Sequence, residues 1–164
     1  MTGPSDRHPA FPRGRWSYQV EARSNAPVAD VWSLLGEARR WKEWSFLDRS
    51  DLERSGSPDP DGVGAIRRFT RFGVGSREEV VVFEPPHHLG YVILSGFPVR
   101  NYRSDIVLSP DETAGTGTHL SWSGTFDVKV PGTGRVLEFV LQRMITRFAS
   151  GATSYADRHG PPIP

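Results

Sequence analysis

The N-terminal part of the chain alternates between hydrophobic and polar residues from Trp16 to Arg23. A period of two is typical of a half-buried β-strand, because successive side chains of a strand point to opposite faces. The pattern therefore predicts a first strand, whose buried face carries four apolar residues, Trp16, Tyr18, Val20 and Ala22.

Two short helices are predicted directly after this strand. Pro27 suits the first turn of a helix, and the apolar residues that follow it recur at helical spacing as far as Leu35. A second helical piece, over residues 37–44, places Trp41 and Trp44 three positions apart and therefore on one face.

Between residues 48 and 128 the pattern changes to short strand-like runs separated by turns rich in Gly and Pro. Six antiparallel strands are predicted, near residues 48–54, 63–72, 75–84, 88–95, 100–109 and 117–128. In the last three, alternation gives an inner face of Leu89, Tyr91, Ile93, Tyr102, Ser104, Ile106, Leu108, Leu120, Trp122 and Phe126. In the strands over 63–72 and 75–84, apolar residues occupy both faces, so alternation does not decide which face is buried.

A long amphipathic helix is predicted after Gly134, because no proline follows until Pro161 and apolar residues recur every three or four positions. The apolar stripe consists of Leu137, Leu141, Met144 or Ile145, Phe148, Ala152 and Tyr155. The helix should span about 20–25 residues and bury this stripe against the sheet. Gly151 has low helix propensity and is expected to allow a bend.

This order of elements predicts an α+β fold: a curved antiparallel sheet of about seven strands, wrapped around the long C-terminal helix, with two short helices after the first strand. A length of 164 residues fits one domain. We place that domain at residues 15–159, with a disordered N-terminal lead-in over 1–14 and a disordered tail over 160–164.

Composition and charge narrow the range of partners and compartments. A net charge of +1 offers no strong field for a nucleic acid, so no nucleic-acid partner is expected. The longest apolar runs are four residues, far below the roughly 20 needed to span a bilayer, so no stable membrane insertion is expected. A soluble, cytoplasmic protein is predicted, as a monomer or a homodimer.

Metal and cofactor chemistry is not indicated by the residue types present. The chain has no cysteine, which excludes thiolate nucleophiles and cysteine zinc sites. Its five histidines lack metal-ligand spacing, and the glycine clusters lack the continuation of a phosphate-binding loop. We therefore expect no metal site and no cofactor.

Six sequence segments, taken in order, resemble the START/Bet v 1-like (SRPBCC) superfamily, and within it the bacterial polyketide cyclase/dehydrase and lipid-transport group. They are APVADVW (26–32), WKEW (41–44), GVGAIRR (62–68), REEV (77–80), PPHHLGY (85–91) and GTHLSW (117–122). The resemblance covers residues from about 15 to 158 and implies the helix-grip fold. It also implies a cavity for an apolar ligand between the sheet and the long helix.

The expected ligand-binding residues combine this resemblance with the strand and helix patterns. They are Trp41, Trp44, Phe69, Tyr91, Tyr102, Trp122, Leu141, Met144, Ile145 and Phe148. The mouth of the cavity is expected to be ringed by the turns over 73–75 and 96–98 and by the segment 41–44. The two turns are expected to be mobile. The polar ends of Tyr91, Tyr102 and Trp122 need partners when buried, either in the core or on a ligand.

Two charged residues in otherwise apolar strands are weak catalytic candidates. If Arg68 points inward, it can hold a carboxylate or enolate oxygen, and Glu79 can pair with it or act as a base. Arg67 and Arg71 share the other face of their strand, which is then expected to be solvated.

Three functions are left open by the sequence. The leading hypothesis is the binding of a hydrophobic small molecule, such as a lipid, an isoprenoid or an aromatic polyketide. A polyketide cyclase or aromatase, which positions its substrate and uses a general acid/base, is the alternative. The third is a protein-interaction or accessory domain whose pocket has collapsed.

Overall fold

The computed structural model describes residues 13–159 of the chain. The predicted disordered lead-in and tail therefore lie outside the described residues, apart from Arg13 and Gly14.

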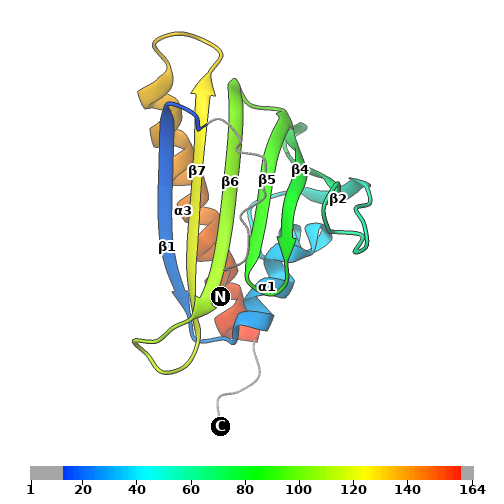
Figure 1. The fold of residues 1–164 in the computed structure, drawn as a ribbon, viewed down its shortest axis with the longest axis vertical. Coiled ribbons are helices and arrows are strands. Elements are labelled where there is room, and N and C mark those ends of the chain that lie inside the picture. Colours follow the sequence, from blue (N-terminus) through cyan, green and yellow to red (C-terminus); the bar gives the residue numbers. More distant parts are fainter. Residues whose placement is uncertain (1–12, 160–164) are drawn as a thin grey trace, which may run out of the picture.

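Seven antiparallel strands form one sheet in the order β1-β7-β6-β5-β4-β3-β2 (Figure 1). The strands are β1 (Trp16–Ser24), β2 (Arg49–Arg54), β3 (Ile66–Arg71), β4 (Val74–Glu84), β5 (His88–Ser95), β6 (Val99–Pro110) and β7 (Thr118–Val128). Two short helices and one 3₁₀ turn follow β1, namely α1 (Val28–Gly36), η1 (Ala38–Arg40) and α2 (Trp41–Trp44). The chain ends with the long helix α3 (Gly134–His159).

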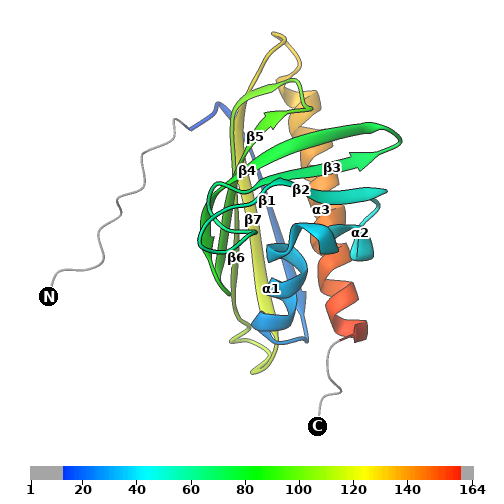
Figure 2. The same ribbon diagram turned by 90° about the vertical axis from the view of Figure 1, so that its right-hand side faces the viewer.

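All three α-helices lie on one side of the sheet (Figure 2). Helix α3 runs along β1 and β7, and the opposite end of the sheet, from β4 to β2, curls toward the helices (Figure 2). This is the helix-grip arrangement expected from the sequence, so the predicted α+β fold is confirmed.

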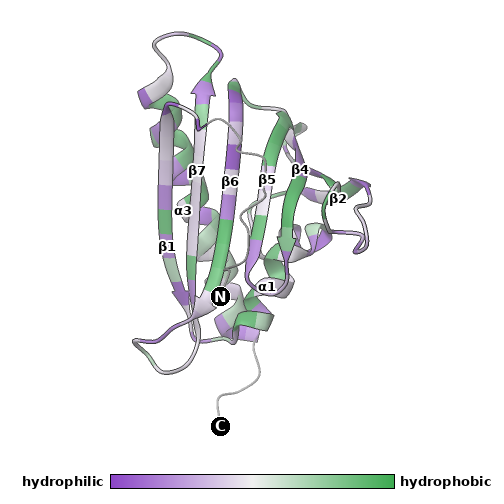
Figure 3. Ribbon diagram, viewed as in Figure 1, coloured by the Kyte–Doolittle hydropathy of each residue, from purple (hydrophilic) through white to green (hydrophobic). Residues whose placement is uncertain are grey.

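Alternation along the last three strands correctly identified their inner face. The side chains predicted to point inward are buried, except Ile93, which is partly buried and packs against the same core. Hydropathy also changes along a strand: β6 is hydrophilic in its first half and hydrophobic in its second (Figure 3). Tyr102, in the hydrophilic first half of β6, lines the cavity described below.

A β-bulge explains why both faces of β4 carry apolar residues. Val80 pairs with Tyr91, but the next pairs on β4 are Val82 with Gly90 and Phe83 with Leu89. The extra residue reverses the inward and outward positions, so Phe83 packs on the helix side against Trp32, with 5.2 Å between ring centroids. Strict alternation could not describe such a strand.

Helix α3 spans 26 residues, slightly more than predicted. Gly151 lies where this helix meets α2. A Cβ at this position would come within 2.7 Å of the Trp44 carbonyl oxygen. The glycine therefore permits a close approach of α2 to α3, which offsets its low helix propensity. Within residues 13–159, no helix is both long and apolar enough to cross a bilayer.

The outer face of the sheet carries an ion-pair cluster around His88. Its Nε2 lies 2.8 Å from Asp105 Oδ1, and Arg103 Nη2 donates a hydrogen bond of 2.7 Å to the same oxygen. The hydrogen bond to Asp105 raises the pKa of His88 above its ordinary value. Burial raises the pKa of Asp105, but the hydrogen bonds from His88 and Arg103 outweigh this and hold it at about 2.

These two shifts predict opposite pH dependences. Protonated His88 stabilises the fold through its pairing with Asp105. This stabilisation is fully present below pH ~6.5 and is lost as the pH rises through the raised pKa of His88. Stability from Asp105 is present above pH ~3.9 and is lost as the pH falls through about 2. We expect His88→Gln to cost up to about 1 kcal/mol near pH 6 and clearly less at pH 9. Urea denaturation of both proteins at these two pH values measures the difference, and an equal cost at both would contradict the assigned protonation.

Candidate functional site

A cavity of about 140 Å³ lies between the sheet and the middle of α3. Its walls come from β3, β4, β5, β6 and β7 on the sheet side and from α2 and α3 on the helix side. The lining residues are Trp41, Leu47, Phe69, Arg71, Val74, Gly75, Ser76, Glu78, Tyr91, Ile93, Gly96, Phe97, Tyr102, Trp122, Met144, Ile145 and Phe148. Most of this surface is apolar, which suits an apolar ligand.

Packed aromatic rings form the inner wall of the cavity. Trp41 stacks on Phe69, with ring centroids 4.6 Å apart, and its ring also contacts Trp122 and Phe148 at 5.8 and 5.5 Å. The indole N–H of Trp41 donates to the Leu35 carbonyl oxygen at 2.9 Å, which fixes the orientation of the ring. The wall is thus held by α1, α2, β3, β7 and α3 together.

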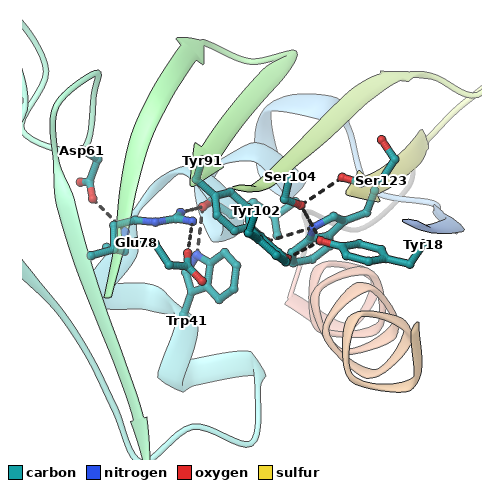
Figure 4. A network of polar contacts seen from close by, with 12 residues as sticks. Tyr18, Trp41, Asp61, Glu78, Tyr91, Tyr102, Ser104 and Ser123 are labelled. Carbon is teal, nitrogen blue, oxygen red and sulfur yellow. Dashed lines mark hydrogen bonds and ion pairs between the residues drawn. The ribbon is translucent and has the colours of Figure 1, made fainter. Parts of the chain in front are cut away.

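The polar ends of three tyrosines and one tryptophan form a hydrogen-bond network with Ser104 (Figure 4). Trp122 Nε1 donates to Ser104 Oγ at 3.0 Å and to the Tyr91 hydroxyl at 3.2 Å. The Tyr18 hydroxyl donates to Ser104 Oγ at 2.8 Å and is hydrogen-bonded to the Tyr102 hydroxyl. Burial raises the pKa of all three tyrosines, so they stay neutral. Their polar ends therefore belong to the core network.

A buried ion pair lies beside this network. Arg67 is 0% exposed and its Nη2 donates to Glu78 Oε2 at 2.9 Å, while its Nη1 reaches the Leu35 carbonyl oxygen at 3.5 Å. The guanidinium also lies over the rings of Trp41 and Tyr91, 4.9 and 5.0 Å from their centroids. Cation–π contacts of this kind offset part of the cost of removing the charge from water.

Glu78 is the acidic side chain that borders the cavity. Its only hydrogen bond within residues 13–159 is the one from Arg67 to Oε2. Burial raises the pKa of Glu78 above its ordinary value, although the charge of Arg67 opposes the rise. A carboxylate beside an apolar cavity can accept a proton from a bound molecule and return it.

The catalytic candidates from the sequence lie elsewhere. Arg68 is exposed and borders a polar surface groove together with Asp51 and Glu53. Glu79 forms an ion pair with Arg54 at 3.2 Å and does not line the cavity. The expectation that Arg67 lies on a solvated face is wrong, because the face of β3 that carries Phe69 points inward and Arg67 shares it. The buried pair is therefore one residue earlier on each strand.

The predicted ligand-binding residues line the cavity with two exceptions. Trp44 and Leu141 are buried, but they pack in the core outside the lining. Of the segments predicted to ring the mouth, five residues line the cavity, namely Trp41, Val74, Gly75, Gly96 and Phe97. The mobility of these turns stays a prediction.

Sequence reasoning missed several lining residues, chiefly Leu47, Ser76 and Glu78, and it expected Arg71, which also lines the cavity, on a solvated face. Glu78 could have been found from the pairing of the strands. It lies opposite Arg67 of β3 on one side and opposite Ile93 of β5 on the other. Opposite charges directly across two strands are the pattern that could have indicated the pair.

Comparisons with known proteins agree with this geometry. The family model described as polyketide cyclase / dehydrase and lipid transport matches residues 15–156. Among curated proteins, no sequence matches the chain.

Solved structures share the fold at low sequence identity. XoxI from Bacillus cereus is 20% identical with a TM-score of 0.72, over 85% of this chain and 94% of that one. A protein from Thermobifida fusca is 27% identical with a TM-score of 0.69, over 87% and 91%. Ara h 8.0201 is 15% identical with a TM-score of 0.65, over 85% and 96%.

The family match covers nearly the whole described chain, and the seven-stranded sheet around α3 is the fold of these structures. The START/Bet v 1-like superfamily is thereby confirmed, and the chain belongs to the polyketide cyclase / dehydrase and lipid transport family.

Proposed function

We propose that the protein binds a small apolar molecule in the cavity between the sheet and α3. The observation that supports this most is an open space with aromatic and aliphatic walls inside an otherwise filled core. Protein interiors are normally close-packed, and an unfilled apolar space lowers stability. A bound apolar ligand would fill this space and offset that cost. The open space also favours binding over an interaction domain with a collapsed interior.

The volume limits what part of a ligand the cavity takes. Pockets for drug-sized ligands are about 300–1,000 Å³, whereas an apolar cavity of about 150 Å³ holds one benzene ring. With about 140 Å³, this cavity fits one ring or a branched group of similar size. A lipid or polyketide would place only such a portion inside, and the remainder would pass the mouth at Gly96 and Phe97.

Toluene is the simplest probe of this proposal. Its ring fills the available volume, and we expect a dissociation constant of about 0.1–1 mM, which corresponds to roughly −5.5 to −4.1 kcal/mol. Ile93→Trp places an indole ring in the cavity and should weaken toluene binding at least about tenfold, as isothermal titration calorimetry measures.

Val107→Trp is the matched control for this change. Val107 lies on the neighbouring strand β6, is 44% exposed and does not line the cavity. Unchanged binding in this variant, with loss in Ile93→Trp, supports the proposal. The proposal fails if neither toluene nor a larger aromatic binds, or if both variants lose binding equally.

A cyclase or dehydrase activity is the second candidate, and Glu78 is the observation that favours it. A carboxylate beside the cavity can remove a proton from the carbon next to a ligand carbonyl, whose electrons then shift to the carbonyl oxygen and form an enolate. The guanidinium of Arg67 lies 2.9 Å from this carboxylate, so a positive group is close to the base. Its Nε is buried and lacks a hydrogen-bond partner within residues 13–159.

Proton exchange tests this second candidate without the natural substrate. Cyclohexanone in D₂O should exchange its α-protons faster with the protein present than with the same concentration of Glu78→Gln, as followed by proton NMR. Equal rates in the two samples would leave ligand binding as the only supported function.

A further inference from the structure

We propose that the ligand carries a neutral hydroxyl group, and that Glu78 accepts the hydrogen bond from it inside the cavity. This inference rests on the proposed binding function and names the chemical class of the ligand: a ring-sized apolar body with one hydroxyl. It follows from the place, burial and partners of Glu78.

The first argument is that one oxygen of Glu78 is free to accept. Glu78 is 7% exposed and borders the cavity, and Arg67 uses Oε2. A carboxylate offers about four acceptor positions on two oxygens, so Oε1 retains acceptor capacity. Oε1 is not among the fully enclosed side-chain atoms that lack a partner, so it is accessible to a molecule in the cavity. A ligand donor can therefore reach it.

The second argument concerns the charge of the ligand. Arg67 and Glu78 carry opposite charges and lie 2.9 Å apart, so the pair is neutral as a unit. A cationic or anionic ligand would leave a net charge among the aromatic rings, which is costly in a low-dielectric interior. A carboxylate ligand would also face the negative oxygens of Glu78. A neutral hydroxyl avoids both penalties.

The third argument is that the hydroxyl groups of the network beside the cavity already have partners, while Ser76, which also lines the cavity, offers only a neutral hydroxyl, a weaker acceptor than a carboxylate. Ser104 accepts from Trp122 and Tyr18 and donates to the Ser123 carbonyl oxygen at 3.1 Å. The Tyr102 hydroxyl is paired with that of Tyr18. Among these groups, Glu78 is the strongest acceptor left to a ligand.

A series of single-ring probes tests the inference on the unaltered protein. Toluene, p-cresol, p-toluate and 4-methylbenzylamine share one ring and a methyl group, and differ in having no polar group, a hydroxyl, an anion or a cation. We expect p-cresol to bind at least about tenfold more tightly than toluene, because a hydrogen bond to a charged acceptor is a strong one. The anion and the cation should bind more weakly than p-cresol.

A double variant, Arg67→Met with Glu78→Leu, provides the matched comparison. It replaces both members of the pair by apolar residues and so leaves no buried charge without a partner. Without an acceptor, the p-cresol hydroxyl loses its hydrogen bonds to water and gains none. The order should therefore reverse, with toluene binding more tightly than p-cresol.

Each outcome of this series has a distinct meaning. Tighter p-cresol binding in the natural protein together with reversal in the double variant supports the inference. Equal affinities for toluene and p-cresol, a preference for either charged probe, or a p-cresol preference that survives in the double variant would overturn it and leave the binding function standing. If no probe binds, the proposed function fails as well.

Discussion

Glu78→Leu should lower the free energy of unfolding by about 3–5 kcal/mol, the usual cost of removing one member of a buried ion pair. Arg67 would then hold a fully buried charge, with no carboxylate partner among residues 13–159. The rings of Trp41 and Tyr91 still face its guanidinium, but cation–π contacts return only a part of the loss. Urea denaturation monitored by tryptophan fluorescence measures the change.

Adding Arg67→Met to this variant should restore most of the stability. Replacement of both charges by apolar residues of similar volume is commonly neutral or stabilising. We expect the double variant to lie within about 1–2 kcal/mol of the natural protein, so the two changes are far from additive. If Glu78→Leu alone is as stable as the natural protein, the two side chains do not form the buried pair described here.

Trp41→Ala should cost about 3–5 kcal/mol and enlarge the cavity. Trp41 is 2% exposed and joins the rings of Phe69, Trp122 and Phe148, so its removal leaves space that the core cannot fill completely. It also deprives the Leu35 carbonyl oxygen of its short hydrogen bond. Naphthalene, whose two rings exceed the present volume, should bind to the variant and not to the natural protein.

Trp32→Ala is the control for this prediction. Trp32 is also part of the core, where it packs against Phe83, but it does not line the cavity. It should lose stability without gaining naphthalene binding, as calorimetry can show. Naphthalene binding in both variants would mean that general loosening of the core, not added space at Trp41, admits the ligand.

The regular part of the fold could be predicted from the sequence because its elements follow their characteristic periods. Burial alternates along the whole of β7 and along β6 from Tyr102 onward, and α3 repeats apolar residues every three or four positions. Gly and Pro separate the strands, so strand limits fall within a few residues of those predicted. Local pattern and tertiary packing agree in these elements.

The faces of β3 and β4 could not be predicted because tertiary structure decides them. A bulge on β4 reverses its alternation after Val80, and β3 buries a charged residue, Arg67, on the same face as Phe69. A charge on an apolar face is normally exposed, and only the partner Glu78 on the adjacent strand makes its burial acceptable. The choice of Arg68 and Glu79 followed from ignoring this pairing.

The candidate site could be predicted in outline but not in size. Trp41, Tyr91 and Phe148 line the cavity as expected. The remaining volume depends on how far rings from five or more elements interlock, and no sequence period reports that quantity. The hydroxyl ends of the tyrosines likewise found partners in one another, which the sequence left open between core and ligand.

The most direct measurement uses the methyl group of Met144, which lines the cavity in a chain with only two methionines. In protein labelled with [¹³C-methyl]methionine, Met144→Leu assigns its signal in a carbon–proton correlation spectrum. We predict that toluene shifts this signal saturably through the ring current of the bound ligand, and that the shift is lost in Ile93→Trp and kept in Val107→Trp. A Met144 signal that does not move at toluene saturation would contradict the claim that this cavity binds an apolar molecule.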